Sequence, residues 1–251
     1  MEKGQLSDSF LPIACVTCRN MQQKNIKVII PAFNEQNSIA RVVADIPKAW
    51  VTEIVVVNNN SQDSTAAVAR EAGVTVLDEP RQGYGYACLK GIEHVSAQTM
   101  PPDILVFLDA DYSDYPEELP AVLQPILEEQ AELVIGSRAL GQRERGAMTP
   151  QQIFGNWLAT RLLGLFYGAE FTDLGPFRAI TFNALQQINM QDKTYGWTVE
   201  MQLKAAKLGL RTAEVPVRYR RRRTGVSKVS GTLKGTILAG YKIIWTIFRY
   251  R

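Results

Sequence analysis

The sequence is poor in the residues that build zinc sites, disulfide frameworks and membrane spans. Its 251 residues include one histidine, His94, and three cysteines, of which Cys15 and Cys18 form a lone C-x-x-C pair. Cysteine and histidine alone cannot assemble a four-ligand zinc site here, and an odd, low cysteine count does not fit a secreted disulfide scaffold. No stretch reaches the ~20 uninterrupted apolar residues that a membrane-spanning helix needs. A signal-peptide pattern is also missing, so we expect a cytoplasmic chain.

Acidic residues are missing from the end of the chain, although the formal net charge of the whole is only +3. Residues 215–251 hold ten of the 28 lysines and arginines and none of the 25 acidic residues. A basic end on an acidic body suits an anionic partner such as a phosphate group, a lipid headgroup or a nucleic acid. No aromatic-glycine RNA-binding signature, zinc-finger spacing or heptad-linked basic helix is present, so nucleic acid is not an expected partner.

Short apolar runs alternate with helical patterns through the first two thirds of the chain. Apolar runs predict strands over 26–30, 54–57, 74–77, 104–108 and 133–135, with Pro31 ending the first. Periodic segments between them predict helices over 38–46, 65–71, 84–95 and 117–128. This alternation indicates an α/β fold with a mainly parallel sheet and helices on both faces. In the last third we predict helices over 151–167, 199–208 and 233–248, and strands over 177–181 and 212–217.

Polar clusters follow three of the predicted strands, at 33–35, 58–63 and 109–111. In open parallel sheets, ligands bind beyond the carboxyl ends of the strands. Asp109 and Asp111 stand two residues apart at such an end, and two carboxylates there can share a hard divalent cation. The residues alone leave open a solvated, capping turn at each of these places.

Basic residues offer candidate phosphate sites at two places. Arg138 follows the predicted strand 133–135, where its guanidinium could pair with phosphate oxygens. The run 220–223 with Lys228 packs five positive charges into nine residues, which suits a phosphate site or a solvated basic loop. Glu200 stands at the start of a predicted helix, where an acid usually interacts with the helix dipole.

Taken in order over about 26–228, these motifs resemble glycosyltransferase family 2, which has the GT-A fold, and more narrowly the dolichyl- or polyprenyl-phosphate sugar synthases. The matching segments are P-x-[YF]-N-E at 31–35, V-V-D-D-G-S-x-D-x-T at 56–65, G-x-G-x-A at 83–87, D-A-D at 109–111, G-S-R at 136–138, D-x-x-x-G-F-R at 173–178 and R-x-G-x-S-K at 223–228. Two departures stand out. Asn58 and Asn59 are amides where the family has acids, and the 173–178 segment is one residue shorter.

The resemblance implies roles for individual residues. Asp109 and Asp111 would hold Mg²⁺ or Mn²⁺ and, with Arg138 and Glu200, would be catalytic. The nucleotide-sugar donor would contact Pro31, Ala32, Phe33, Asn34, Glu35, Asn58, Asn59, Asp63, Gly83, Lys90, Asp109 and Ala110. Phosphate or acceptor would contact Arg138, Asp173, Arg178, Arg223, Ser227 and Lys228.

The activity that the resemblance implies is an inverting, metal-dependent transfer of a hexose from UDP-glucose or GDP-mannose to a polyprenyl or dolichyl phosphate. Such an acceptor oxygen is already anionic near pH 7, whereas a hydroxyl acceptor would need a base, with Glu200 or Asp173 as the candidate. A glycan or other hydroxyl acceptor in cell-envelope biosynthesis is the alternative within the family. A sugar-nucleotide pyrophosphorylase would carry a glycine-rich, basic loop after the first strand, where this chain has 31–35. A non-catalytic membrane or nucleic-acid adaptor with a basic tail is the alternative of another class.

We expect three segments: a flexible extension over 1–25, a GT-A domain over 26–230, and an amphipathic helix over 231–251. In the last segment, apolar residues including Trp245 and Phe248 recur every three to four positions among lysines and arginines. A basic amphipathic helix of this kind suits an anionic membrane surface, which places the protein peripherally on the cytoplasmic face. A core or dimer helix fits the same pattern.

Overall fold

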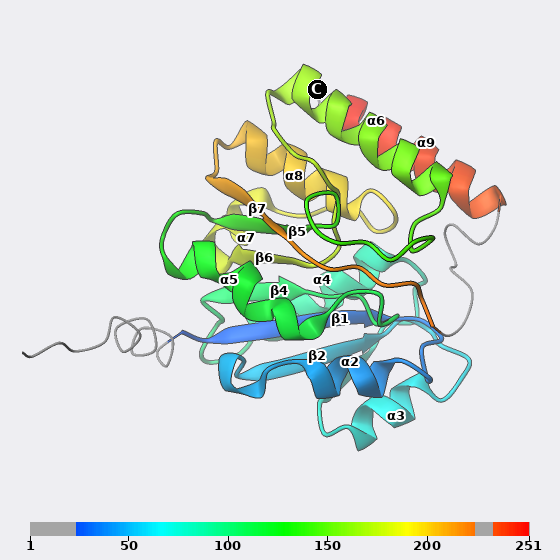
Figure 1. Cartoon of the computed structure of the whole chain (residues 1–251). Helices are drawn as coiled ribbons and strands as arrows, with labels where there is room; N and C mark the ends of the chain where they lie inside the picture. Colours follow the sequence, from blue (N-terminus) through cyan, green and yellow to red (C-terminus); the bar gives the residue numbers. More distant parts are fainter. Residues whose placement is uncertain (1–23, 224–232, 251) are drawn as a thin grey trace, which may run out of the picture.

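One seven-stranded sheet organises the part of the chain that the computed structural model describes, residues 24–223 and 233–250 (Figure 1). The strand order is β3-β2-β1-β4-β6-β5-β7. The bounds are β1 Ile26–Ala32, β2 Glu53–Asn58, β3 Thr75–Asp78, β4 Ile104–Phe107, β5 Leu133–Ser137, β6 Arg178–Thr181 and β7 Thr212–Pro216. Among these strands only β6 is antiparallel to its neighbours, β4 and β5. The prediction of a mainly parallel α/β sheet is confirmed.

Helices cover both faces of this sheet, as predicted. Those of the described residues are α2 Ile39–Asp45, α3 Thr65–Glu71, α4 Tyr84–Ser96, α5 Leu119–Leu127, α6 Pro150–Tyr167, α7 Phe182–Ile188, α8 Trp197–Lys207 and α9 Leu233–Arg249. Helices α2, α3 and α5 share one core cluster with the sheet, and α4, α6, α7, α8 and α9 share the other. The C-terminal helix therefore packs on the same face as α8.

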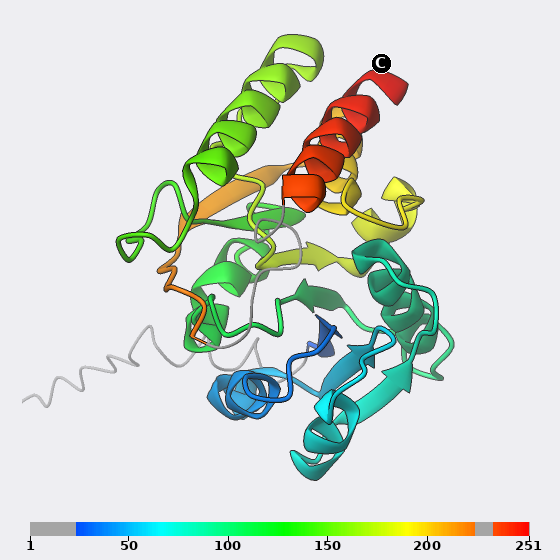
Figure 2. The ribbon, with the colours of Figure 1, turned by 90° about the vertical axis from the view of Figure 1, so that its right-hand side faces the viewer.

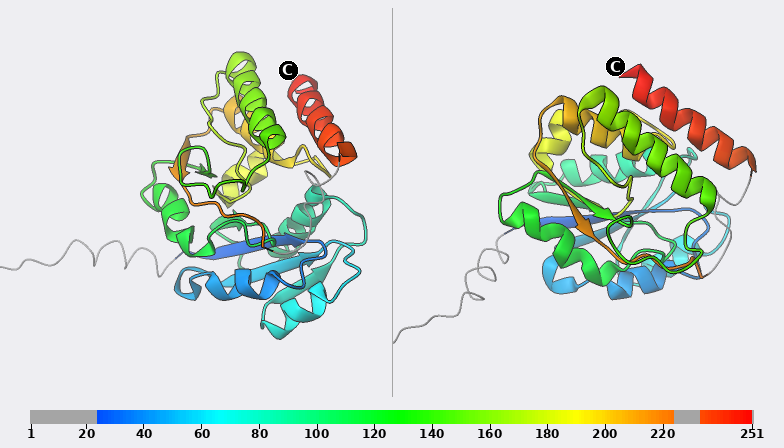
Figure 3. Two further views of the ribbon diagram at one scale, coloured as in Figure 1. Left: turned by 45° about the vertical axis from the view of Figure 1, so that its right-hand side comes forward. Right: turned by 45° about the horizontal axis from the view of Figure 1, so that its top comes forward.

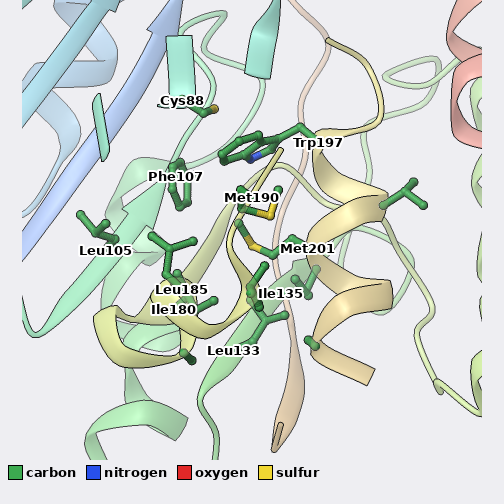
Figure 4. Packing of buried hydrophobic residues seen from close by; sticks show 14 of the residues in the cluster. Cys88, Leu105, Phe107, Leu133, Ile135, Ile180, Leu185, Met190, Trp197 and Met201 are labelled. Atoms are coloured by element: carbon green, nitrogen blue, oxygen red, sulfur yellow. The ribbon is translucent and has the colours of Figure 1, made fainter. Parts of the chain in front are cut away.

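Side chains alternate between these two cores along each strand, because successive residues of a strand point to opposite faces. On β4, Leu105 and Phe107 belong to the core with α4 and α8, whereas Ile104 and Val106 belong to the other. Figure 4 shows the first core around Phe107 and Trp197, whose rings meet edge to face with centroids 5.8 Å apart. This packing fixes where β4 ends.

Three elements differ from their predictions. Strand β1 continues through Pro31 to Ala32, where it pairs with β2 after its pairing with β4 has ended at Ile29. Proline is tolerated where one side of a strand needs no donor. The predicted helix 117–128 is split into a 3₁₀ turn, Pro116–Glu118, and α5, in which Pro125 lies. Helix α7 was not predicted, because its seven residues follow β6 directly.

Helices α6 and α9 lie side by side on the outer layer of the molecule (Figures 2 and 3). The rings of Phe166 and Phe248 meet between them with centroids 5.3 Å apart and planes inclined by 59°. The Tyr167 hydroxyl also donates a hydrogen bond to the carbonyl oxygen of Ile247. The predicted extension over 1–25 falls almost wholly outside the described residues, as do Ser227 and Lys228.

An ion-pair network closes the amino-terminal edge of the sheet. The Lys27 ammonium, on β1, is buried and pairs with Glu53 of β2 at 3.0 Å. Burial raises the pKa of Glu53, but hydrogen bonds from Gln98, Lys27 and Thr75 outweigh it and hold that pKa at about 2. Ionised Glu53 therefore ties the first two strands together at the edge opposite the polar clusters.

We expect Glu53→Gln to lower the free energy of unfolding at pH 7 by about 2 kcal/mol, because it leaves the Lys27 charge buried without its partner. The folded pKa lies below the ordinary value of 4.5. The stabilisation is therefore present above about pH 4.5 and is lost as the pH falls towards 2. Urea unfolding at pH 7, 5 and 3 measures this, with Glu71→Gln on the exposed end of α3 as control. A pH-independent difference between the two variants would contradict the role of Glu53.

Candidate active site

A pocket of about 470 Å³ opens where the strands β1, β2, β4 and β5 end. These carboxyl ends carry the polar clusters, so a parallel sheet brings segments distant in sequence to one edge. The lining residues are Pro31, Ala32, Phe33, Glu35, Asn59, Gln82, Gly83, Tyr84, Asp109, Ala110, Asp111, Arg138, Gln152, Thr194, Tyr195, Tyr219 and Arg222. The first eleven come from the N-terminal half of the fold and the rest from its C-terminal half.

Two carboxylates lie at the centre of this lining. Asp109 follows β4, and burial together with the negative charge of Asp111 raises the pKa of Asp109 to about 7. Its Oδ1 atom is buried without a hydrogen-bond partner among the described residues. Asp111 is held from the other side by the backbone N–H of Ser113, at 2.9 Å. An unpartnered carboxylate oxygen beside a second carboxylate fits a hard divalent cation.

The protein supplies few further ligands for such a cation. In the described ranges, 24–223 and 233–250, no group of three or more acidic, histidine or cysteine side chains is placed to hold a metal. A cation at Asp109 and Asp111 would therefore keep open positions for water or phosphate oxygens, as Mg²⁺ commonly does when it binds a nucleotide.

Positive charge comes first from Arg138, directly after β5. Its Nε and Nη2 atoms donate to the two carboxylate oxygens of Asp173, at 2.8 and 2.7 Å. Burial alone would lower the pKa of Arg138, but the Asp173 carboxylate outweighs burial and raises it. Asp173 itself is not a lining residue. It holds the guanidinium in place, and no hydrogen bond from the Nη1 atom is found among the described residues, so its donors can meet a ligand.

The arginines that follow β7 differ in burial and in whether they reach the pocket. Arg220 is buried, and its guanidinium donates to the carbonyl oxygens of Tyr112 and Asp114 at 2.7 and 3.0 Å. It thereby anchors the run to the loop that follows Asp111. Arg222 reaches the pocket and pairs with Glu35 and with Asp111, at 3.4 Å from the latter. Arg223 is exposed and does not line the pocket.

The side-chain amide of Asn59 holds the segment 79–83, which forms part of the pocket wall. Its Nδ2 group donates to the carbonyl oxygens of Glu79 and Arg81, and its Oδ1 accepts the N–H of Gly83 at 2.8 Å. Gly83 has φ of +151°, a conformation that glycine adopts readily and other residues avoid. An amide can make all three contacts, whereas an ionised carboxylate could not donate the first two.

Several predicted donor residues lie just behind the lining. Asn34 Oδ1 accepts the N–H of Gln62, and Asp63 accepts the N–H groups of Gln36 and Thr65. These bonds hold the 33–36 turn against the segment after β2. Asn58 donates to Asp78, and Lys90 pairs with Glu93 on the surface of α4. None of the four lines the pocket.

Two predicted site residues are directed elsewhere. The buried guanidinium of Arg178 donates to the carbonyl oxygens of Leu174, Gly175 and Thr198, and burial lowers its pKa to about 10. Glu200 is fully buried outside the pocket, where its carboxylate accepts the N–H groups of Gln191 and Asp192. The structure places both side chains outside the pocket lining, where they hold the loops around the site, and their catalytic or acceptor-binding role stays a prediction.

Seven lining residues were not among the predicted site residues, and two of them, Gln82 and Tyr84, flank the predicted Gly83. Arg222 belongs to the basic run that the sequence singles out, but only the fold shows which arginine turns inward. Gln152, Thr194, Tyr195 and Tyr219 carry no motif in the sequence, and they come from three segments of the C-terminal half. Tyr219 lies under the Arg138 guanidinium, 5.0 Å from ring centroid to Cζ.

We expect Asp173→Asn to lower the free energy of unfolding by about 3–5 kcal/mol, because it leaves the buried Arg138 charge uncompensated. The double variant Arg138→Met with Asp173→Leu removes both charges and should regain part of that loss. Urea unfolding followed by circular dichroism measures both. A loss below about 1 kcal/mol in the single variant would rule out Asp173 as the group that holds Arg138.

Known proteins show the same sequence pattern and the same fold. The family described as Glycosyl transferase family 2 matches residues 27–189. An uncharacterized glycosyltransferase of Mycobacterium tuberculosis is 36% identical over 217 residues, which are 85% of this chain and 94% of the relative. Undecaprenyl-phosphate mannosyltransferase of Micrococcus luteus is 31% identical over 222 residues, 84% of this chain and 89% of that protein.

Solved structures agree in fold at lower identity. Glucosyl-3-phosphoglycerate synthase of Mycobacterium tuberculosis, in complex with phosphoglyceric acid, superposes with a TM-score of 0.75 at 22% identity. The match covers 97% of this chain and 85% of that one. The family match spans well over half of the chain, and the resemblance seen in the motifs is confirmed. The chain belongs to glycosyl transferase family 2 and is a glycosyltransferase with the GT-A fold.

Proposed function

We propose that this glycosyltransferase moves a hexose from a nucleoside-diphosphate sugar, UDP-glucose or GDP-mannose, to the phosphate of a polyprenyl lipid at a membrane surface. The reaction is an inverting, single displacement that needs Mg²⁺ or Mn²⁺ at Asp109 and Asp111. The observation that carries the proposal is the pocket itself, which joins a carboxylate pair to buried arginine charge and reaches the first turn of α6, where exposed apolar side chains follow.

The donor side rests on the carboxylates at the end of β4. A divalent cation bound there would neutralise the negative charge that develops on the leaving diphosphate. Glucosyl-3-phosphoglycerate synthase has been crystallised with Mn²⁺, UDP-glucose and phosphoglyceric acid, with a TM-score of 0.75 at 22% identity to this chain. Residues 31–35 and the Gly83 turn would hold the nucleotide, and the Arg138 Nη1 donors would bind a phosphate oxygen.

The acceptor class follows from the acids available in the pocket. Of the described lining residues, Glu35, Asp109 and Asp111 are the carboxylates. The two aspartates would be committed to the cation, and Glu35 pairs with Arg222 and accepts a hydrogen bond from Ser38 at 2.9 Å. No uncommitted carboxylate then remains among these residues to deprotonate a hydroxyl. A phosphate oxygen, already anionic near pH 7, needs no such base.

Helix α6 connects this pocket to an exposed apolar surface. Gln152, in its first turn, lines the pocket, whereas Phe154 and Trp157 just beyond are 60% and 52% exposed. On the adjacent α9, Tyr241, Ile244, Trp245 and Phe248 are exposed as well. We call these two stretches the α6–α9 apolar surface. Exposed aromatic and aliphatic side chains this close to a phosphate site suit a lipid whose head enters the pocket while its tail stays outside.

Charge on the same helices favours an anionic membrane surface. Arg161 of α6 and Arg249 of α9 are exposed, and the Arg249 guanidinium carbon Cζ lies 4.9 Å from the Trp245 ring centroid. Basic residues among interfacial aromatics favour anionic headgroups. None of the helices described here is long and apolar enough to cross a membrane. The proposal places the protein peripherally, on the cytoplasmic face.

The names of two relatives also support a lipid-phosphate acceptor. One is an undecaprenyl-phosphate mannosyltransferase, and a Methanococcus voltae relative, 28% identical over 252 residues, is named UDP-N-acetylglucosamine–dolichyl-phosphate N-acetylglucosaminyltransferase. Phosphoglyceric acid, the ligand of the glucosyl-3-phosphoglycerate synthase crystals, also presents a phosphate group. A small phosphorylated acceptor is therefore the second candidate.

We expect labelled sugar to pass from UDP-glucose or GDP-mannose to undecaprenyl phosphate in detergent when Mn²⁺ or Mg²⁺ is present. Chelation should stop the transfer, and Asp111→Asn should slow it at least about 100-fold, because the diphosphate charge is no longer neutralised. Extraction into organic solvent measures the lipid product. Asp78→Asn, an exposed surface carboxylate, is the matched control.

The same assay with phosphoglyceric acid separates the two acceptors. Label on that acid and none on the lipid would overturn the lipid proposal and keep the transferase. Metal-dependent donor hydrolysis without either product would discard both acceptors. If the protein neither transfers sugar from nor binds any nucleotide sugar of a wider panel of donors, the result would favour the alternative of a non-catalytic adaptor.

We expect the protein to sediment with vesicles that contain phosphatidylglycerol, and expect the double variant Phe154→Ser with Trp157→Ser to bind at least about fivefold less. Burial of these side chains in the interface supplies the apolar part of the affinity. Binding should also weaken as salt is raised, because exposed charges are screened. Met100→Ser, an exposed apolar residue between α4 and β4, is the control. Equal binding by both variants would contradict a role for the α6–α9 apolar surface.

A further inference from the structure

One wall of the pocket is an irregular loop. The segment Gln191–Gly196, which we call the 191–196 loop, carries Thr194 and Tyr195 into the pocket lining. It has no regular secondary structure. Backbone groups of such a loop need partners from side chains or water. The position of Thr194 and Tyr195 therefore depends on whatever holds these backbone groups.

Two buried carboxylates hold the loop. Glu200 accepts the N–H of Gln191 at 2.9 Å and that of Asp192 at 2.6 Å. Asp192 Oδ1 accepts the N–H of Thr194 at 2.7 Å and that of Gly196 at 3.1 Å. Four of the six loop amides are thus tied to two acids. Hydrogen bonds to a charged acceptor are stronger than those between neutral groups.

The two acids are in turn contacted by α9 and by the residue that follows it, and Glu200 also pairs with Lys204 of α8 at 2.6 Å. The Tyr250 hydroxyl donates to Glu200 Oε1 at 2.8 Å, and the Lys242 ammonium pairs with Asp192 Oδ2 at 3.0 Å. Burial and the Glu200 carboxylate raise the pKa of Tyr250 to about 12, so the phenol stays a donor at neutral pH. In Figure 2 the yellow segment that precedes α8 lies beside the red helix α9.

The 191–196 loop also packs closely against the turn that precedes α4. A Cβ added to Gly85 would come within 2.1 Å of the Asp192 carbonyl oxygen, and one added to Gly83 within 2.3 Å of that of Lys193. The N–H of Tyr86 donates to the Lys193 carbonyl oxygen at 3.1 Å. A shift of the loop would therefore change the pocket on both of its halves.

We propose that Lys242 and Tyr250 of the α9 segment are positioning residues for the reaction pocket: through Asp192 and Glu200 they fix the 191–196 loop and hence the wall formed by Thr194 and Tyr195. This inference deepens the proposed function and rests on it only for the identity of the acceptor that this wall meets. The outer side of the same helix belongs to the α6–α9 apolar surface. One helix thus joins the membrane-facing side of the molecule to the reacting side.

The test compares Tyr250→Phe, Lys242→Met and their combination with the unsubstituted protein. Hydrogen exchange of peptides that cover residues 190–197 reports on the four tied amides and needs no acceptor. We expect exchange there to speed up at least about tenfold in the double variant, with peptides of β1 and β4 unchanged. Tyr241→Phe, which changes an exposed tyrosine of the same helix, should have no effect. Lys242→Arg keeps the charge opposite Asp192 and should restore slow exchange.

Two results would overturn the inference. Unchanged exchange at 190–197 in the double variant would mean that α9 does not hold the loop. Faster exchange spread evenly over β1, β4 and the loop would mean general destabilisation instead of positioning. Where transfer is measurable, the double variant should raise the KM for the acceptor several-fold with kcat less affected, and an unchanged KM beside a changed loop would also overturn it. Absence of transfer in the unsubstituted protein would instead count against the proposed function and leave the exchange result standing.

Discussion

The site depends on one electrostatic constraint: two carboxylates, Asp109 and Asp111, end a fully buried strand. Taking like charges out of water is costly, and the raised pKa of Asp109, about 7, expresses that cost. The surrounding architecture supplies compensation from a distance. Arg138 is held at the pocket by Asp173, and Arg222 bridges Glu35 and Asp111. Such a site is stable when a cation or a counter-charged side chain is present, which is the condition under which a metal-assisted transferase operates.

How much of the fold and of the site the sequence predicts depends on how far apart in the chain the interacting residues lie. The strands and the ligand edge follow from local periodicity, and Asp109, Asp111 and Arg138 follow from their positions after buried strands. Interactions between distant segments produce no local pattern in the sequence. Asp173 lies 35 residues from Arg138, and nothing local shows that its carboxylate is spent on that guanidinium. Glu200 reads as a helix-start acid, although its partners include Tyr250, 50 residues away.

The arginine run at 220–223 shows the same limit within four residues. Composition marks the run as a candidate phosphate site, but successive residues of an extended segment face opposite ways. Arg221 and Arg223 are accordingly exposed. Arg220 turns inward onto Tyr112 and Asp114, and Arg222 turns into the pocket. Which of them meets a ligand is decided by the loop after Asp111, a contact that only the folded chain provides. The amide at Asn59 is similar, because its three bonds around the Gly83 turn explain why an acid is not required there.

The two halves of the pocket are formed by different kinds of segment. Strands β1, β2 and β4 and the start of α4 form the half that the family resemblance assigns to the nucleotide, and each contributes through its own strand end or turn. The other half comes from Arg138 after β5, the start of α6, the 191–196 loop and the run after β7, and the last two of these are irregular. Irregular segments keep a defined position only when side chains satisfy their backbone groups. Glu200 and Asp192 do so here: Glu200 is contacted by Lys204 of α8 and by Tyr250 just after α9, and Asp192 is contacted by Lys242 of α9. The same helix exposes Trp245 and Phe248, so an apolar face and a wall of the pocket share one rigid support. For the lipid-phosphate acceptor that we propose, such a shared support would order the surface beside the lipid together with the wall beside its phosphate.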